Sequence, residues 1–154
     1  MQELIVSTFS TPIGWIEVRY DEHFIHNAIF VEKKTYQPSN NKTGIFIANE
    51  IDAYFSNPHH RFKLSLKPHG SLYQQRVWNE LLVIPVGRTL TYGELANTLQ
   101  SSPRAVGQAC KKNPLALFIP CHRVVGKTSQ GGYMGLTTAL HYKIDLLNHE
   151  TVTL

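Results

Sequence analysis

Two helix starts lie within residues 91–112, which read TYGELANTLQSSPRAVGQACKK. In the first, Thr91 and Glu94 have the spacing of a capping box, in which each side chain accepts a hydrogen bond from the other residue's backbone N–H. In the second, Ser102 precedes Pro103, and a serine cap followed by a first-turn proline is a common helix N-terminus. This stretch therefore decides the fold of the second half of the chain.

The signals predict two short helices, residues 92–99 and 103–112, joined by a tight link. Asn113-Pro114 stops the second helix, because the residue before a proline disfavours the helical conformation. Two short helices joined in this way have the shape of a helix-turn-helix, whose second helix faces DNA. The small residues of the second helix also suit tight helix packing, so the pattern alone leaves both interpretations open.

Downstream, the stretch IPCHRVV (residues 119–125) places Cys121, His122 and Arg123 side by side. The thiolate is the reactive form of cysteine, and a neighbouring histidine or positive charge lowers its pKa. The cluster therefore favours a nucleophile. A buried structural cysteine beside surface charges gives the same letters, so the context has to decide.

The first 70 residues have the pattern of a small sheet with one helix. Alternating apolar and polar residues predict strands at 4–9, 15–20 and 24–31, with a Thr-Pro-Ile-Gly turn between the first two. Apolar residues at helical spacing predict a helix over 44–55, and alternation over 62–66 predicts one more strand.

Residues 67–70, Lys-Pro-His-Gly, mark a boundary after which the apolar spacing becomes helical. The residues expected on one face of the next helix are Tyr73, Val77, Leu81 and Ile84. A last helix, from about residue 138, is expected to bury Leu140, Ile144 and Leu147. The sequence thus predicts an α+β fold with an N-terminal domain at 1–68 and a C-terminal domain at 69–154.

Charge and composition limit the classes of function. The net charge is +4, and no acidic residue occurs between Leu95 and Ile144. A polyanionic partner suits this half, and a mildly basic solvated surface is the alternative. No run approaches the roughly 18 apolar residues of a membrane span, and the first residues carry no basic leader. Two cysteines form no disulfide framework, so we expect a chain without a membrane span in a reducing compartment.

Several separated motifs agree with one family. They are PCHRV (120–124), RAVG (104–107), TYGELA (91–96), Asn113-Pro114, and a late segment from Lys143 to Leu147 followed by His149-Glu150. In order and approximate spacing they closely resemble the O6-alkylguanine-DNA alkyltransferases, also called methylated-DNA–protein-cysteine methyltransferases. The resemblance is specific over about residues 71–150 and weak over 1–70.

The resemblance implies a small ribonuclease-H-like α/β N-terminal domain and a helical C-terminal domain with a winged helix-turn-helix that enters the minor groove of double-stranded DNA. It implies DNA repair by direct reversal, in which an O6-alkylguanine is flipped out of the duplex and its alkyl group passes irreversibly to Cys121, once per chain. O4-alkylthymine as a further substrate stays open. We expect a monomer with no cofactor, located in the cytoplasm, or in the nucleus of a eukaryotic host.

The resemblance also implies roles for single residues. Cys121 would accept the alkyl group, His122 would deprotonate it through a bridging water, and Glu150 would hold His122. Asn113 would tie this network to its turn, and Tyr92 would donate to the departing guanine.

Further residues would hold the DNA. Arg104 would fill the gap that the extruded base leaves, and the remaining DNA contacts would come from Arg123, Lys111 and Lys112. The base pocket would be lined by Tyr133, Met134 and Val124. Relatives that bind zinc in the N-terminal domain use cysteines, and residues 1–70 contain none, so no metal site is expected.

One departure from the family pattern affects the pocket. The usual Tyr-x-Gly-Gly loop reads Tyr133-Met134-Gly135-Leu136, which leaves the range of accepted alkyl groups open.

Two other functions compete with the assignment. A non-enzymatic alkyltransferase-like protein would bind damaged DNA without transfer, although such proteins usually lack the cysteine. A cysteine hydrolase using Cys121 and His122 would turn over repeatedly and would need an oxyanion hole.

Overall fold

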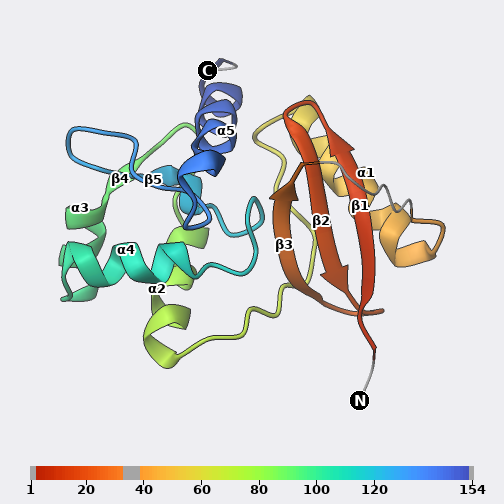
Figure 1. The fold of residues 1–154 in the computed structure, drawn as a ribbon, viewed down its shortest axis with the longest axis horizontal. Helices are drawn as coiled ribbons and strands as arrows, with labels where there is room; N and C mark the ends of the chain where they lie inside the picture. Colours follow the sequence, from red (N-terminus) through yellow and green to blue (C-terminus); the bar gives the residue numbers. More distant parts are fainter. Residues whose placement is uncertain (1–2, 33–38, 153–154) are drawn as a thin grey trace.

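The computed structural model describes residues 3–32 and 39–152. In the first half, strands β1 (Ile5–Thr11), β2 (Gly14–Tyr20) and β3 (Ile25–Val31) form an antiparallel sheet in the order β1-β2-β3, and helix α1 (Lys42–Ser56) follows. Helices and two very short strands make up the second half, which lies beside β3 (Figure 1). The three predicted strands and the predicted helix are confirmed, with ends that differ by at most two residues.

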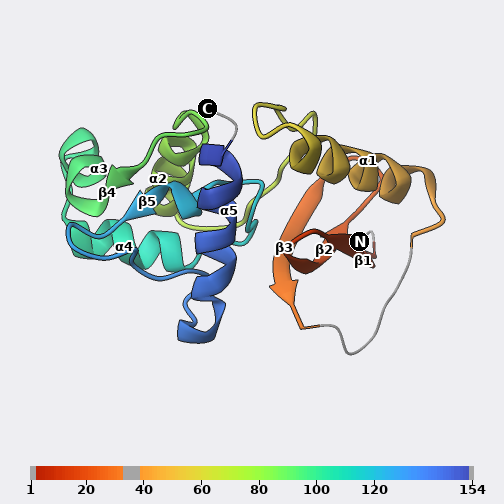
Figure 2. The same ribbon diagram turned by 90° about the horizontal axis from the view of Figure 1, so that it is seen from above.

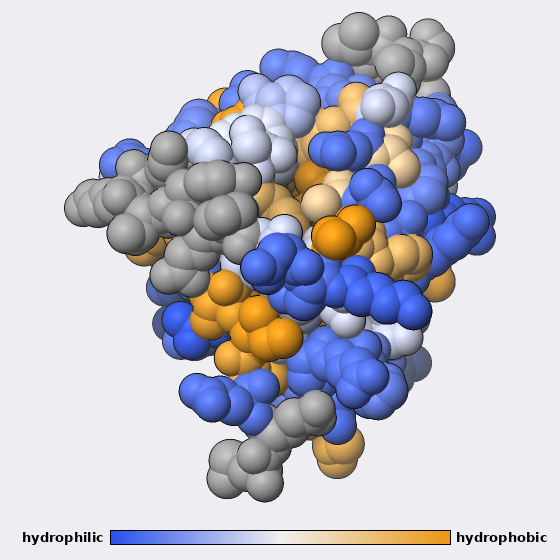
Figure 3. All heavy atoms as spheres, turned by 90° about the vertical axis from the view of Figure 1, so that its right-hand side faces the viewer, coloured by the Kyte–Doolittle hydropathy of each residue, from blue (hydrophilic) through white to orange (hydrophobic). Residues whose placement is uncertain are grey.

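The first half has a core between the sheet and its helix. Ile16 and Val18 of β2 and Ile47 and Ile51 of α1 are fully buried in the same apolar cluster. Figure 2 shows α1 lying across one face of the sheet. Seen from the side of β1 and α1, the surface is mostly hydrophilic with scattered apolar patches (Figure 3).

The segment 62–66, predicted as a strand, forms only an isolated bridge. Its alternating burial is as expected, but the pairing is limited to Leu66 with Ile25. The reason is that the open edge of β3 is shared with a segment from the second half. The backbone N–H of Ala28 donates to the carbonyl of Pro114 at 2.9 Å, and the N–H of Ala116 donates to the carbonyl of Ala28 at 3.0 Å. The two halves are thus joined through the sheet edge.

The four helices that the sequence predicts in the second half are present, whereas its two short strands and two 3₁₀ turns were not predicted. The elements of this half are α2 (Leu72–Leu82), β4 (Leu90–Thr91), α3 (Tyr92–Leu99), α4 (Pro103–Lys111), η1 (Cys121–Arg123), β5 (Val124–Val125), η2 (Thr137–Ala139) and α5 (Leu140–Val152). The Thr91–Glu94 capping box is present, and the Ser102 side chain caps α4. The short strands β4 and β5 pair in parallel, which places the residues after η1 beside the start of α3.

The buried face of α5 differs from the prediction. Leu140 and Leu147 are partly exposed and Ile144 is exposed, so the expected stripe is wrong. The side chains that are buried instead are Tyr142, Lys143, Leu146 and Glu150. The buried face of α5 is rotated relative to the predicted one, because it includes two charged residues, Lys143 and Glu150. Apolar periodicity cannot reveal a buried face that carries charged residues.

Within the described part of the chain, none of the helices is long and apolar enough to cross a bilayer. The ribonuclease-H-like topology and the division into domains at residue 68 stay predictions.

Candidate active site

Cys121 is the first residue of the 3₁₀ turn η1, and its side chain is almost fully buried, with 5% of the residue exposed. In a strand, the side chains of Cys121 and His122 would point to opposite faces, whereas a turn leaves both available to one site. The preceding loop is held by Asn113, whose Nδ2 donates to the carbonyl of Ile119 at 2.9 Å and whose Oδ1 accepts from the N–H of Leu115 at 2.9 Å. Asn113 therefore fixes the approach of the chain to the cysteine.

His122 is completely buried and hydrogen-bonded to Glu150. Its Nε2 lies 2.9 Å from Glu150 Oε2, and a carboxylate accepts, so the ring proton is on Nε2. The other nitrogen, Nδ1, is buried and has no hydrogen-bond partner within residues 3–32 and 39–152. Burial lowers the pKa of His122, against the opposing effect of Glu150. The ring is neutral at neutral pH, and Nδ1 is a free acceptor for a proton.

Glu150 lies at the centre of a charged network. Its carboxylate also accepts from Arg123 Nε at 2.9 Å, from Arg123 Nη2 at 2.8 Å and from the Tyr54 hydroxyl at 2.7 Å. Burial alone would raise the pKa of Glu150, but the hydrogen bonds from His122 and Arg123 and the positive charge of Arg123 hold it well below its usual range. The carboxylate is therefore a permanent negative charge beside His122.

The position of Arg123 corrects its predicted role. Besides its two bonds to Glu150, its Nη1 donates to the carbonyl of Ile84 at 2.7 Å, and 11% of its side chain is exposed. A guanidinium engaged in this way is not available for a phosphate. Arg123 therefore holds Glu150, and these contacts argue against its predicted role as a DNA contact.

Lys143 is a buried cation that the sequence analysis did not assign to the site. Its ammonium donates to the carbonyls of Val124 at 2.6 Å and Gly132 at 3.0 Å, and its residue has no exposed surface. Burial lowers the pKa of Lys143, and the two cysteines are the groups whose negative forms raise it. The signal in the sequence was a lysine within the last helix, in a region that lacks acidic residues to pair with it.

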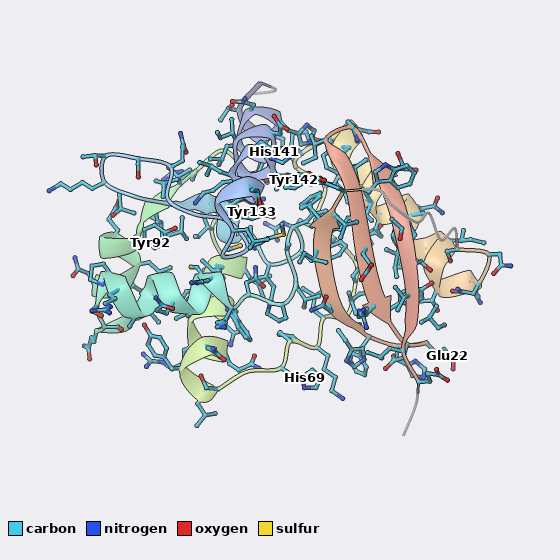
Figure 4. The ribbon with its side chains drawn as sticks, in the orientation of Figure 1. Glu22, His69, Tyr92, Tyr133, His141 and Tyr142 are labelled. Carbon is cyan, nitrogen blue, oxygen red and sulfur yellow. The ribbon has the colours of Figure 1, made fainter. Side chains whose placement is uncertain are left out.

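The two cysteines line one cavity of about 330 Å³. Its other lining residues are Tyr92, Gly107, Lys111, Gly131, Gly132, Tyr133, Met134, Gly135, Leu136 and Leu140. Tyr92, the first residue of α3, and Tyr133, next to α5, are labelled in Figure 4. Of the three predicted pocket residues, Tyr133 and Met134 line the cavity. Val124 does not, because it is buried in β5, where its carbonyl accepts from Lys143.

The groups around the cavity are protonated at rest. Burial raises the pKa of the Cys121 thiol, while the Asn113 side chain and the Lys143 charge lower it in part. Burial also raises the pKa of Tyr92 to about 12, so its hydroxyl remains a donor at neutral pH. The site thus combines a neutral thiol, a neutral histidine on a fixed carboxylate, a buried cation and a phenol, which are the parts of a cysteine nucleophile with a base and a proton donor.

The predicted surface residues lie on or next to α4. Arg104 is exposed in the first turn of that helix, and Lys111 and Lys112 are exposed at its end. Lys111 also borders the cavity. In the part of the chain that is described, no group of three or more His, Cys, Asp or Glu side chains has the arrangement of a metal site.

A family model described as 6-O-methylguanine DNA methyltransferase, DNA binding domain, matches residues 72–152, more than half of the chain. The chain belongs to the methylated-DNA–protein-cysteine methyltransferase family. It is 38% identical over 148 residues to the methylated-DNA–protein-cysteine methyltransferase of Methanosarcina mazei, with 91% of this chain and 92% of the relative covered. It is 36% identical over 151 residues to that of Mycobacterium leprae, with 93% and 90% covered.

Solved structures of this methyltransferase family have the same fold. The O6-methylguanine methyltransferase of Mycobacterium tuberculosis superposes with a TM-score of 0.81 at 31% identity, covering 97% of this chain and 95% of that one. The same organism's OGT in complex with DNA superposes with a TM-score of 0.79 at 33% identity, covering 96% and 93%. The family assignment from the sequence motifs is therefore confirmed.

Proposed function

We propose that this chain repairs DNA by taking the alkyl group of an O6-alkylguanine onto Cys121. The observation that carries the proposal is the position of Cys121 in a cavity next to a base that Glu150 holds. A base inside a duplex cannot reach a buried thiol, so the nucleotide has to leave the stack, which costs a few kcal/mol and is easiest for a damaged base. The cavity of about 330 Å³ is the place that would receive it.

The transfer would proceed as an in-line displacement. The Cys121 proton passes through a bridging water to His122 Nδ1, and the sulfur attacks the alkyl carbon as the bond from that carbon to guanine O6 breaks. The bonding electrons go to the purine, where the Tyr92 hydroxyl donates to the developing charge. Glu150 stabilises the imidazolium that forms. The product is a thioether, which has no nucleophilic sulfur, so each chain acts once.

The DNA would lie against the helix-turn-helix of α3 and α4. The exposed Arg104 at the start of α4 supports its proposed role of filling the space left by the everted base, and Lys111 and Lys112 supply phosphate contacts. Entry from the minor groove is part of this proposal, as is the monomeric state. The name of the M. tuberculosis complex with DNA and the matched DNA-binding domain support DNA as the partner.

The test of the function is a titration of the protein with duplex DNA that contains one O6-methylguanine per molecule. We expect a plateau at one methyl group per chain, found on the peptide with Cys121 by intact mass and peptide mapping, and none with Cys121→Ser. Continuous product would indicate a hydrolase, and binding without transfer would indicate a damage-binding protein. A methyl group on Cys110, or on neither cysteine, would overturn the assignment.

Gly131 offers a test of Tyr92 in this reaction. A Cβ at Gly131, whose φ is +77°, would lie 2.6 Å from the Tyr92 hydroxyl oxygen and 2.9 Å from its Cε2. We expect Gly131→Ala to push the ring aside and to slow methyl transfer about tenfold, equivalent to ~1.4 kcal/mol of barrier. Single-turnover kinetics with the methylated duplex would measure this.

The control is Gly93→Ala in α3, because a Cβ there meets only the Thr91 hydroxyl at an ordinary 3.8 Å. It should transfer methyl groups at the wild-type rate. Equal rates for Gly131→Ala and the wild type would show that the position of Tyr92 does not limit the reaction.

A further inference from the structure

Tyr54, in the last turns of α1, connects the N-terminal half to the catalytic network. It is 1% exposed, and its hydroxyl donates to Glu150 Oε2 at 2.7 Å across 96 residues of sequence. Figure 2 shows the C-terminal end of α1 directed towards α5, which carries Glu150. In the sequence, Tyr54 is only one of the apolar positions whose spacing predicts the helix over 44–55.

The Tyr54 hydrogen bond completes the set of donors around Glu150. Oε2 accepts from His122, Arg123 and Tyr54, and Oε1 accepts from Arg123. An ionised carboxylate offers about four acceptor sites, two on each oxygen, and three of these four donors converge on Oε2. The carboxylate cannot rotate without losing some of these hydrogen bonds.

Tyr54 is itself held firmly. Its carbonyl accepts from His149 Nε2 at 2.9 Å, and its ring packs against Phe62, Phe55 and His149 at centroid distances of 5.3, 5.0 and 5.0 Å. Burial, together with the neighbouring Glu150 charge, raises the pKa of Tyr54, so the hydroxyl always carries its proton. A rigid, permanently protonated donor can fix an acceptor in place.

We propose that Tyr54 is a positioning residue for the alkyl transfer: it fixes Glu150 and shares its negative charge, and it thereby sets how strongly Glu150 acts on His122. The inference rests on the proposed function of Cys121. The N-terminal half contributes none of the reacting groups, but through Tyr54 it would influence the reaction.

The test is Tyr54→Phe, which keeps the ring and removes the donor. We expect single-turnover methyl transfer at the pH plateau to slow about threefold to tenfold, because a carboxylate that is held less firmly positions the bonded His122 ring less precisely for proton transfer. We also expect the acid limb of the pH–rate profile to move to higher pH. With one donor fewer, Glu150 directs more of its charge to His122 and stabilises the protonated ring, while the other charged groups acting on His122, Arg123 and Lys143, are unchanged.

The matched control is Tyr20→Phe. Tyr20 is equally buried in the first half, and its hydroxyl bonds Ser7 at 2.8 Å and Asn41 at 2.9 Å, away from Glu150. This variant should lose stability but keep the wild-type midpoint of the acid limb. If Tyr54 were merely structural, Tyr54→Phe would likewise lose stability without a change in the acid limb. An acid-limb midpoint of Tyr54→Phe equal to that of the wild type therefore overturns the inference, whatever the plateau rate.

A second variant is expected to shift the acid limb in the opposite direction, and it tests the inference even if Tyr54→Phe does not fold. Fluorine at the 3-position makes the tyrosine hydroxyl a stronger donor, so 3-fluorotyrosine at position 54 should move the acid limb to lower pH. An unchanged or higher midpoint counts against the inference. Failure of the proposed function itself would be recognised separately, because wild-type protein would then carry no methyl group on Cys121.

Discussion

Replacing Glu150 with glutamine is expected to slow methyl transfer about a hundredfold and to destabilise the fold by about 3 to 5 kcal/mol. The amide presents one acceptor oxygen where the carboxylate has two, and its NH₂ group would face a donor in either orientation: Arg123 Nε at the position of Oε1, or the three donors of His122, Arg123 and Tyr54 at the position of Oε2. The imidazolium that forms on deprotonation of Cys121 would lose its stabilising charge, and Arg123 would be left as a buried cation. Single-turnover kinetics and urea denaturation would measure the two effects.

The stability effect should depend on pH in a defined direction. The folded state holds the pKa of Glu150 well below its usual range, whereas an unfolded glutamate titrates near about 4.3. A group with a lowered pKa stabilises the fold above its unfolded pKa, and the contribution is lost as the pH falls towards the folded pKa. The difference in stability between the wild type and Glu150→Gln should therefore narrow below about pH 4.3.

Glu22→Gln is the control, since Glu22 is exposed and lies far from α5 (Figure 4). It should change neither the transfer rate nor the stability. If Glu150→Gln transferred methyl groups at the wild-type rate, the carboxylate would have no part in activating the thiol, and the role of Tyr54 would fall with it.

The sequence was sufficient to predict the helix starts at Thr91 and Ser102, the Cys121-His122 pair and the family, because each depends on local motifs. The partners of Glu150 could not be predicted from local motifs. Tyr54 comes from a helix almost a hundred residues earlier, and only packing brings it to the carboxylate. The resemblance assigned Arg123 to DNA, whereas the structure pairs it with Glu150, and a largely buried ion pair leaves no local pattern in the sequence.

The error in the face of α5 has the same origin. Apolar periodicity predicts which side of a helix meets an apolar core, and α5 instead buries Lys143 and Glu150. Charged residues are rarely buried unless they are paired or functional, so a helix that carries charged residues inward contradicts the rule on which the prediction depends.

Replacing Lys143 with methionine is expected to slow methyl transfer about a hundredfold, equivalent to ~2.7 kcal/mol of barrier. Methionine keeps an unbranched stem and removes the charge. Burial lowers the pKa of Lys143, and the negative forms of Cys121 and Cys110 raise it. We therefore expect the ammonium to stabilise a thiolate at Cys121, because a buried cation gains from a nearby negative charge.

The pKa of the Cys121 thiol should be higher in Lys143→Met than in the wild type. The pH dependence of its alkylation by iodoacetamide, in the absence of DNA, would measure this pKa. The melting temperature should change little, because removal of an unpaired buried charge offsets the loss of a donor to the Val124 and Gly132 carbonyls. Lys42→Met, an exposed lysine at the start of α1, should leave all three quantities unchanged. If the thiol of Lys143→Met reacted with the pH dependence of the wild type, the ammonium would be structural, and activation of Cys121 would depend on His122 and Glu150 alone.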